Sequence, residues 1–105
     1  MTDRELIERA ARAAGITGEY LDGLGFIPID ANGARGAWWN PLEEDGDALR
    51  LMVTCQLDVF VRAGRWTEAV APMGAPAKVL HDGDALAATR RAITMAAAQL
   101  KKAQA

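Results

Sequence analysis

The chain has 105 residues, of which half are hydrophobic and a quarter are charged, and this is the composition of one soluble globular domain. Twelve Lys and Arg against fourteen Asp and Glu leave a net charge of -2. This balance argues against nucleic acid as a partner, because phosphate backbones attract clustered positive charge. No apolar run reaches the roughly 18 residues that span a membrane, and the single cysteine fits a reducing compartment. We expect one cytoplasmic domain over residues 1–105, without a secretory or transit peptide, because the first residues form an acidic helical pattern.

The first predicted element is a helix over residues 3–14. Thr2 and Glu5 match a capping box, in which each side chain bonds a free backbone donor of the other residue, and Gly15 is placed to end the helix. Residues 16–44 are then expected to form a long loop around the core, because glycines and prolines interrupt every period. Within it, residues 26–29 are predicted as a short edge strand, where Pro28 is tolerated because an edge needs no donor.

A second helix is predicted from Asp45 to about Cys55 or Gln56, with Asp45 and Asp47 capping its start. Its expected packing residues are Leu49, Leu51, Met52 and Val53. Alternating apolar residues predict a strand over residues 57–62, which returns after a turn as a second strand over residues 66–70. A third short strand is expected over residues 78–81.

The last predicted helix runs from Asp84 to about Ala103, and Lys101 and Lys102 in its last turn complement its dipole. Its buried face is expected to consist of Leu86, Thr89, Ile93, Ala96, Ala97 and Leu100. The pentapeptide Asp-Gly-Asp-Ala-Leu occurs at residues 45–49 and again at residues 82–86, which we interpret as one way of starting a helix used twice. The elements together predict an α+β fold, with a small, mainly antiparallel sheet of roughly two to four strands covered by about three helices, as a helix–sheet–helix sandwich.

Catalysis is not expected from these residues. The chain has no serine, and its only cysteine and only histidine, Cys55 and His81, could form a nucleophilic pair only if the fold brought them together. We expect a packing role for Cys55 and a loop or capping role for His81. The aspartates at positions 45, 47, 82 and 84 do not match a calcium loop, and one Cys with one His excludes a standard zinc site, so no metal or cofactor is predicted. The charges of Arg90, Arg91, Lys101 and Lys102 are expected to form a solvated face.

The most informative segment for function is Trp38-Trp39-Asn40-Pro41-Leu42. Adjacent tryptophans in a loop do not easily point into the same core, so one of them could pack inward while the other serves as a surface anchor for a partner. The alternative is that both cover the edge of the sheet and hold the loop in place. The binding hypothesis takes Trp38, Trp39 and Asn40 as candidate contact residues, whereas Trp66 is expected to pack within the sheet.

Three segments together resemble a known family. Trp39-Asn40-Pro41-Leu42, Asp45-Gly46-Asp47-Ala48-Leu49-Arg50-Leu51 and Ala88-Thr89-Arg90-Arg91-Ala92-Ile93 are similar to motifs of the phage ABA sandwich domain, found in small proteins of tailed bacteriophages and prophages. The resemblance covers residues 38–100 and implies a layered helix–sheet–helix arrangement and a phage or prophage origin. The family has no assigned activity, so no functional residue is carried over. Within the chain itself, Arg50 and Arg90 are expected to pair with nearby acids.

Three functional hypotheses remain open at this point. The first is a non-enzymatic accessory protein that binds a host or phage macromolecule in the host cytoplasm, and it predicts an exposed aromatic patch. The second is a small-ligand or nucleotide-binding protein, which predicts a pocket of roughly 300 Å³ or more near the long loop. The third is a structural component that self-associates through its alanine-rich last helix, which predicts a symmetric apolar interface.

Overall fold

The structure is a computed structural model that describes residues 1–100. Three helices and two small antiparallel sheets confirm the α+β class. The elements in chain order are α1 (Asp3–Ala13), β1 (Gly18–Leu21), β2 (Gly25–Pro28), α2 (Asp45–Thr54), β3 (Asp58–Arg62), β4 (Trp66–Val70), β5 (Ala77–Leu80) and α3 (Ala85–Ala98). None of the helices described is long and apolar enough to cross a membrane.

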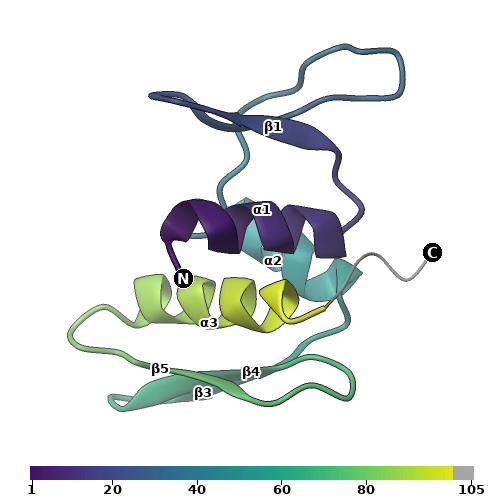
Figure 1. The fold of residues 1–105 in the computed structure, drawn as a ribbon. Coiled ribbons are helices and arrows are strands. Elements are labelled where there is room, and N and C mark those ends of the chain that lie inside the picture. Colours follow the sequence, from purple (N-terminus) through teal and green to yellow (C-terminus); the bar gives the residue numbers. More distant parts are fainter. Residues whose placement is uncertain (101–105) are drawn as a thin grey trace.

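The elements stack in layers, and α3 lies at the centre of the stack. It packs against β4 and β5 on one side and against α1 and α2 on the other. The β1–β2 hairpin lies beyond α1, at the opposite end of the molecule from the three-stranded sheet β3–β4–β5 (Figure 1). Since every other helix and the larger sheet contact α3, this helix links the layers of the domain.

The first helix has the ends that its sequence predicts. The Thr2 hydroxyl accepts a hydrogen bond from the Glu5 N–H, and the Glu5 carboxylate accepts from the Thr2 N–H in return. Hydrogen bonds from the Thr2 backbone and side chain lower the pKa of Glu5. At the other end Gly15 has a φ of 75°, and the N–H groups of Gly15 and Ile16 bond back to carbonyls of the last helical turn, as in a Schellman motif.

The second helix has the predicted bounds, but not the predicted cap and only part of the predicted packing face. Its N-cap residue is Glu44, which makes no capping bond through its side chain, so the expected capping by Asp45 and Asp47 is wrong. The expected packing residues Leu49 and Val53 are exposed. Leu51 is buried as expected, together with Ala48 and Cys55, and Met52 is partly buried against the core. Apolar residues occur around much of this helix, and only the side towards α3 is covered.

The repeated pentapeptide does not have one conformation. At residues 45–49 it is entirely helical and forms the start of α2. In the second copy, residues 82–84 form a turn before the helix, with Asp82 and Gly83 at φ values of 49° and 87°, and Ala85 and Leu86 begin α3. Only there does the last aspartate, Asp84, act as an N-cap, accepting a hydrogen bond from the Ala87 N–H. Both copies therefore start a helix as expected, but they do so in different conformations.

The expected edge strand at residues 26–29 is present as β2, and it pairs with a strand that the sequence pattern did not reveal. β1 and β2 form a hairpin in which Tyr20 lies opposite Phe26. The hairpin requires glycine at position 18, because a Cβ there would lie 2.3 Å from the Ile27 carbonyl oxygen. Phe26 also meets Trp39 edge-to-face, with ring centroids 5.8 Å apart, and this contact anchors the long loop to the hairpin.

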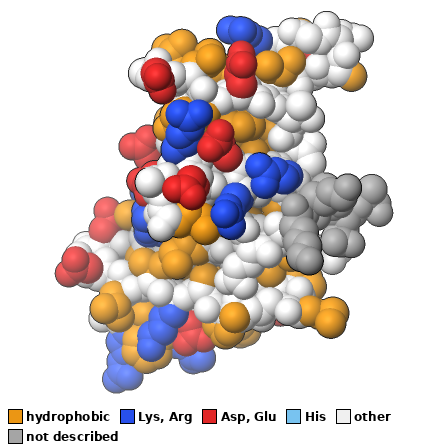
Figure 2. Space-filling model, viewed as in Figure 1, with side chains coloured by type: hydrophobic (Ala, Val, Ile, Leu, Met, Phe, Trp, Pro, Cys, Tyr) orange, Lys and Arg blue, Asp and Glu red, His pale blue; other side chains and the backbone are white. Residues whose placement is uncertain are grey.

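The larger sheet has the three strands that alternation predicts. Residues 59, 61, 67, 69, 77 and 79 share one face, and on that face Thr67 and Ala69 are completely buried beneath α3. The opposite face carries Phe60, Trp66 and Leu80 together with charged residues. Lys and Arg side chains gather at the end of the molecule that this sheet forms, at the bottom of the view (Figure 2). Trp66 is half-buried as expected, with the Lys78 Nζ 3.9 Å from its ring centroid.

The last helix, α3, begins as predicted after Asp84 and ends at Ala98. The predicted extension to Ala103, with Lys101 and Lys102, lies outside the described residues. Leu86, expected in the core, is 66% exposed. Leu86 precedes the buried Ala88 by two residues. Because residues two apart project about 200° apart around a helix, Leu86 lies on the side of α3 that faces away from the core.

Candidate functional site

The residues of the long loop just after the tryptophans are fixed by hydrogen bonds to α2. The Asn40 N–H donates to Asp47 Oδ2 over 2.9 Å, and Asp47 Oδ1 accepts from the Arg50 guanidinium over 2.8 Å. Asp47 is buried, so both of its oxygens are satisfied where an unpaired carboxylate would be costly. The expected pairing of Arg50 with an acid is confirmed.

Arg90 connects the same loop to α3. Its Nε donates to the Leu42 carbonyl oxygen over 2.9 Å, and its Nη1 lies 2.8 Å from Asp45 Oδ1. The expected pairing of Arg90 is therefore also confirmed. Together these contacts join the three segments that carry the family resemblance, so the polar residues of those motifs hold the loop, α2 and α3 in one arrangement.

Beside this fixed loop lie two adjoining hollows, which share Tyr20, Asn40 and Glu43 in their linings. The larger has a volume of about 540 Å³ and reaches from Ile7 and Leu42 to the turn at His81. The smaller, of about 480 Å³, extends beneath Trp38 and the tip of the hairpin. We call the two hollows together the loop groove.

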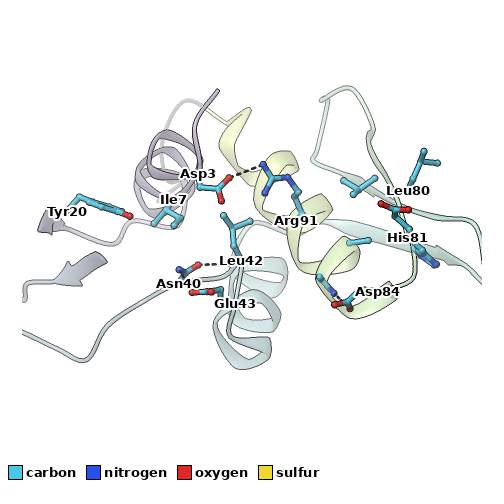
Figure 3. A pocket seen from close by; sticks show the side chains of 14 residues that line it. Asp3, Ile7, Tyr20, Asn40, Leu42, Glu43, Leu80, His81, Asp84 and Arg91 are labelled. Atoms are coloured by element: carbon cyan, nitrogen blue, oxygen red, sulfur yellow. Dashed lines mark hydrogen bonds and ion pairs between the residues drawn. The ribbon is translucent and has the colours of Figure 1, made fainter. Parts of the chain in front are cut away.

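Figure 3 shows the larger hollow of the loop groove. Tyr20, Asn40, Leu42 and Glu43 lie on one side of it, Leu80, His81 and Asp84 lie on the other, and the ion pair of Asp3 with Arg91 lies between them. These residues come from six separate elements or loops, so the site exists only in the folded chain.

The lining of the larger hollow is strongly acidic. Four carboxylates and one guanidinium line it, those of Asp3, Glu43, Asp82, Asp84 and Arg91. Arg91 is already paired, with its Nη2 2.9 Å from Asp3 Oδ1. Within residues 1–100 the other three carboxylates have no ion-pair partner. The hollow therefore presents uncompensated negative charge next to apolar surface from Ile7, Leu42 and Leu80.

The structure separates the two adjacent tryptophans. Trp39 is 7% exposed and packs on Phe26 in the core, whereas Trp38 is 39% exposed and lines the smaller hollow. Trp38 also covers Gly25, where a Cβ would lie 2.4 Å from the indole Nε1. Part of the Trp38 ring is thus held against the hairpin, and the rest of it faces the groove.

Asn40 contributes little free hydrogen-bonding capacity. Its Oδ1 accepts from the Leu42 N–H over 2.9 Å, and its Nδ2 donates to the Glu43 carboxylate over 3.2 Å. Its backbone N–H is the group that bonds Asp47. Asn40 lines both hollows, but its polar atoms shape the loop, so its contribution to the groove is positional.

Cys55 and His81 line different hollows, Cys55 at the end of α2 and His81 in the loop groove. Cys55 is buried as expected, and this burial raises the pKa of its thiol. His81 is buried as well; its Nε2 lies 2.9 Å from Thr67 Oγ1, which in turn lies 2.8 Å from Thr89 Oγ1. This chain of polar contacts ties the turn before α3 to the sheet, which fits the expected loop role.

The described part of the chain holds no group of three His, Cys, Asp or Glu side chains placed to bind a metal ion. Of the aspartates weighed above, Asp45 and Asp47 are engaged with Arg90 and Arg50. Asp82 and Asp84 lie at the turn before α3.

Comparison of the chain with protein-family models, with curated proteins and with solved structures finds no match.

The sequence identified the loop side of the groove but missed its opposite wall. Trp38 and Asn40 stand out as an unusual local pattern, whereas Asp82 and Leu80 look like ordinary turn and strand residues. They become part of the site only because the turn after β5 lies across from the loop. The sequence offers one signal for this wall of the groove: Asp82-Gly83 before a helix start is typical of a tight turn.

Proposed function

We propose that this protein is a non-enzymatic accessory protein of a phage or prophage, which binds a macromolecule in the cytoplasm of the bacterial host. The binding site is the loop groove, and the fitting partner is a protein segment that carries Lys or Arg beside apolar side chains. The single observation that carries the proposal is the partly exposed indole of Trp38 next to a hollow with three carboxylates that have no ion-pair partner within residues 1–100.

Two physical arguments support this assignment. Tryptophan is enriched among the residues that contribute most to protein–protein binding, because a large rigid ring buries much area at low entropic cost. Uncompensated carboxylates attract cationic side chains, accelerate association and select against acidic partners. The phage or prophage origin rests on the resemblance of the Trp39–Leu42, Asp45–Leu51 and Ala88–Ile93 segments to the phage ABA sandwich family.

A small-ligand protein is the second candidate, and one observation favours it. The larger hollow exceeds the roughly 300 Å³ typical of ligand pockets and lies beside the loop, with a volume of about 540 Å³. Its carboxylates favour a cationic molecule over a nucleotide, because phosphate groups would be repelled. Self-association through α3 has less support, since Ala92, Ala96 and Ala97 are completely buried inside the protein.

The proposal can be tested with a displayed library of random peptides. We expect peptides selected on the immobilised protein to be enriched in Lys or Arg with apolar neighbours, and to bind Trp38→Ala at least tenfold more weakly. Leu86→Ala is the matched control, because it removes an exposed apolar side chain that does not line the groove. Peptides that bind Trp38→Ala and the wild type equally would overturn the role of the groove.

A second pair of variants tests the role of the groove carboxylates. Asp82→Asn removes a groove carboxylate, and asparagine tolerates the positive φ of this position. The control, Glu44→Gln, removes an exposed carboxylate that adjoins Glu43 in sequence but does not line the groove. We expect Asp82→Asn alone to weaken binding of cationic peptides. If instead no peptide binds while a small cation such as a polyamine does, the second candidate becomes the better one.

The phage or prophage origin is tested separately by sequencing the flanking genes, where phage structural or lysis genes are expected.

A further inference from the structure

The three-stranded sheet has two edges that differ in how they are protected. Edge strands expose unpaired N–H and C=O groups, and proteins commonly block them with lysine, proline or a covering segment. β5 has Lys78 at its second position and follows Pro76. β3 has the sequence Asp-Val-Phe-Val-Arg, with no such residue in its interior.

The free edge of β3 is also unpaired and apolar. In the described part of the chain β3 pairs only with β4. Phe60 is 49% exposed on the outer face, and Val61 is 56% exposed on the face that α3 covers elsewhere. Val61 lies opposite the fully buried Thr67, and no strand within residues 1–100 pairs with β3 on its other side. A strand added at this edge would cover both side chains.

The sequence of β3 is complementary to itself in the antiparallel direction. When two copies pair with Phe60 opposite Phe60, Val59 of each copy lies opposite Val61 of the other. Asp58 of each copy then lies opposite Arg62 of the other, on the same face as the two phenylalanines, because side chains alternate along a strand. Opposite charges directly across an antiparallel pair stabilise it, as do aromatic and β-branched pairs.

We propose that the protein forms a symmetric dimer through β3, in which two three-stranded sheets join into one antiparallel sheet of six strands. The occupant of the edge is a second copy of this chain, and the register is fixed by two Asp58–Arg62 pairs. A twofold axis at Phe60 makes each contact occur twice, as in other isologous dimers. No residue of β3 lines the loop groove, and β5, which does, forms the other edge of the sheet, so the loop groove stays open in the dimer.

The test is a charge swap read by sedimentation equilibrium over a concentration series. The wild type is expected to have twice the mass of the chain at high concentration. Asp58→Arg places like charges opposite each other in both pairs, and so does Arg62→Asp. Each variant alone is therefore expected to dimerise about tenfold more weakly. Mixed in equal amounts, the two variants restore both opposite-charge pairs, and the mixture is expected to dimerise as well as the wild type.

The control is Arg12→Glu, which reverses an exposed charge in the last turn of α1 and is expected to leave dimerisation unchanged. Circular dichroism of each variant shows that it is folded. A wild type that stays monomeric up to millimolar concentration overturns the proposal. A dimer that neither single variant weakens, or a mixture that fails to regain the mass, shows that β3 in this register is not the interface.

Discussion

At the scale of single residues, the two adjacent tryptophans should give opposite results when truncated. Trp39 fills the space between the hairpin and the core, so we expect Trp39→Ala to lower the free energy of unfolding by about 3–5 kcal/mol. Trp38 leaves much of its ring in solvent, and Trp38→Ala is expected to cost less than about 1 kcal/mol. Urea titrations followed by circular dichroism compare the two variants. If both unfold the protein, Trp38 is a packing residue and cannot be a free anchor.

The buried thiol provides a test by pH. Burial raises the pKa of Cys55, so the folded protein holds the thiol proton more tightly than the unfolded chain does. The resulting stability is fully present below the pKa of the unfolded chain, about 8.5, and is lost as the pH rises from there towards the folded-state value. We expect the free energy of unfolding to fall more steeply from about pH 8 to pH 10 in the wild type than in Cys55→Ala. Parallel curves for the two proteins would mean that Cys55 is accessible to water.

At the scale of elements, the repeated pentapeptide offers two glycines with opposite requirements. Gly83 has a φ of 87°, so Gly83→Ala is expected to destabilise the protein by about 1–2 kcal/mol. Gly46 lies in the first turn of α2, and a Cβ there meets only the flexible end of Arg50, at 3.3 Å. Gly46→Ala is therefore expected to stabilise the protein by up to about 1 kcal/mol. Thermal melts of the two variants should shift in opposite directions, and shifts of the same sign would contradict the two different structures of the repeat.

Leucines on two helices test which helix faces are buried. Leu51 of α2 is in the core, whereas Leu86 of α3 points to solvent. We expect Leu51→Ala to cost about 2–5 kcal/mol and Leu86→Ala less than about 0.5 kcal/mol. Chemical denaturation measures both. A large loss for Leu86→Ala would mean that another surface covers this residue in solution.

These elements also show how far the sequence alone could predict the fold. Helix bounds were predictable, because the capping box at Thr2 and the glycine at position 15 are local signals. The packing face of α2 was not, since Leu49 and Leu51 are equally apolar and only the position of α3 decides which one is buried. β1 was missed because its four residues include Gly18 and show no alternation; the hairpin partner and the covering aromatic rings make it a strand.

At the scale of the whole molecule, the candidate site depends on the layers rather than on any motif. The loop groove joins the start of α1, the hairpin, the loop at Asn40 and the turn after β5. Local patterns could reveal the tryptophans, but sequence could not show that Asp82 would line the same groove as Trp38. The proposed dimer interface, in contrast, depends on a local sequence. Once β3 is known to be an edge strand, the five residues Asp58–Arg62 alone show that Asp58 and Arg62 can pair with a second copy.

The central position of α3 leads to a prediction about how the domain unfolds. Ala96 is completely buried in α3, so Ala96→Leu inserts a larger side chain where no space exists and is expected to cost about 1–3 kcal/mol. Because α3 packs on the sheet as well as on α1 and α2, the loss should reach both ends of the molecule. Proteins that keep only Trp39 or only Trp66, with the other tryptophans changed to phenylalanine, report on the hairpin side and on the sheet by fluorescence. In both of them Ala96→Leu should lower the urea midpoint by the same amount, whereas Ala85→Leu at the exposed start of the helix should leave it unchanged. A shift seen by Trp66 alone would mean that the hairpin and its loop unfold independently of the helical core.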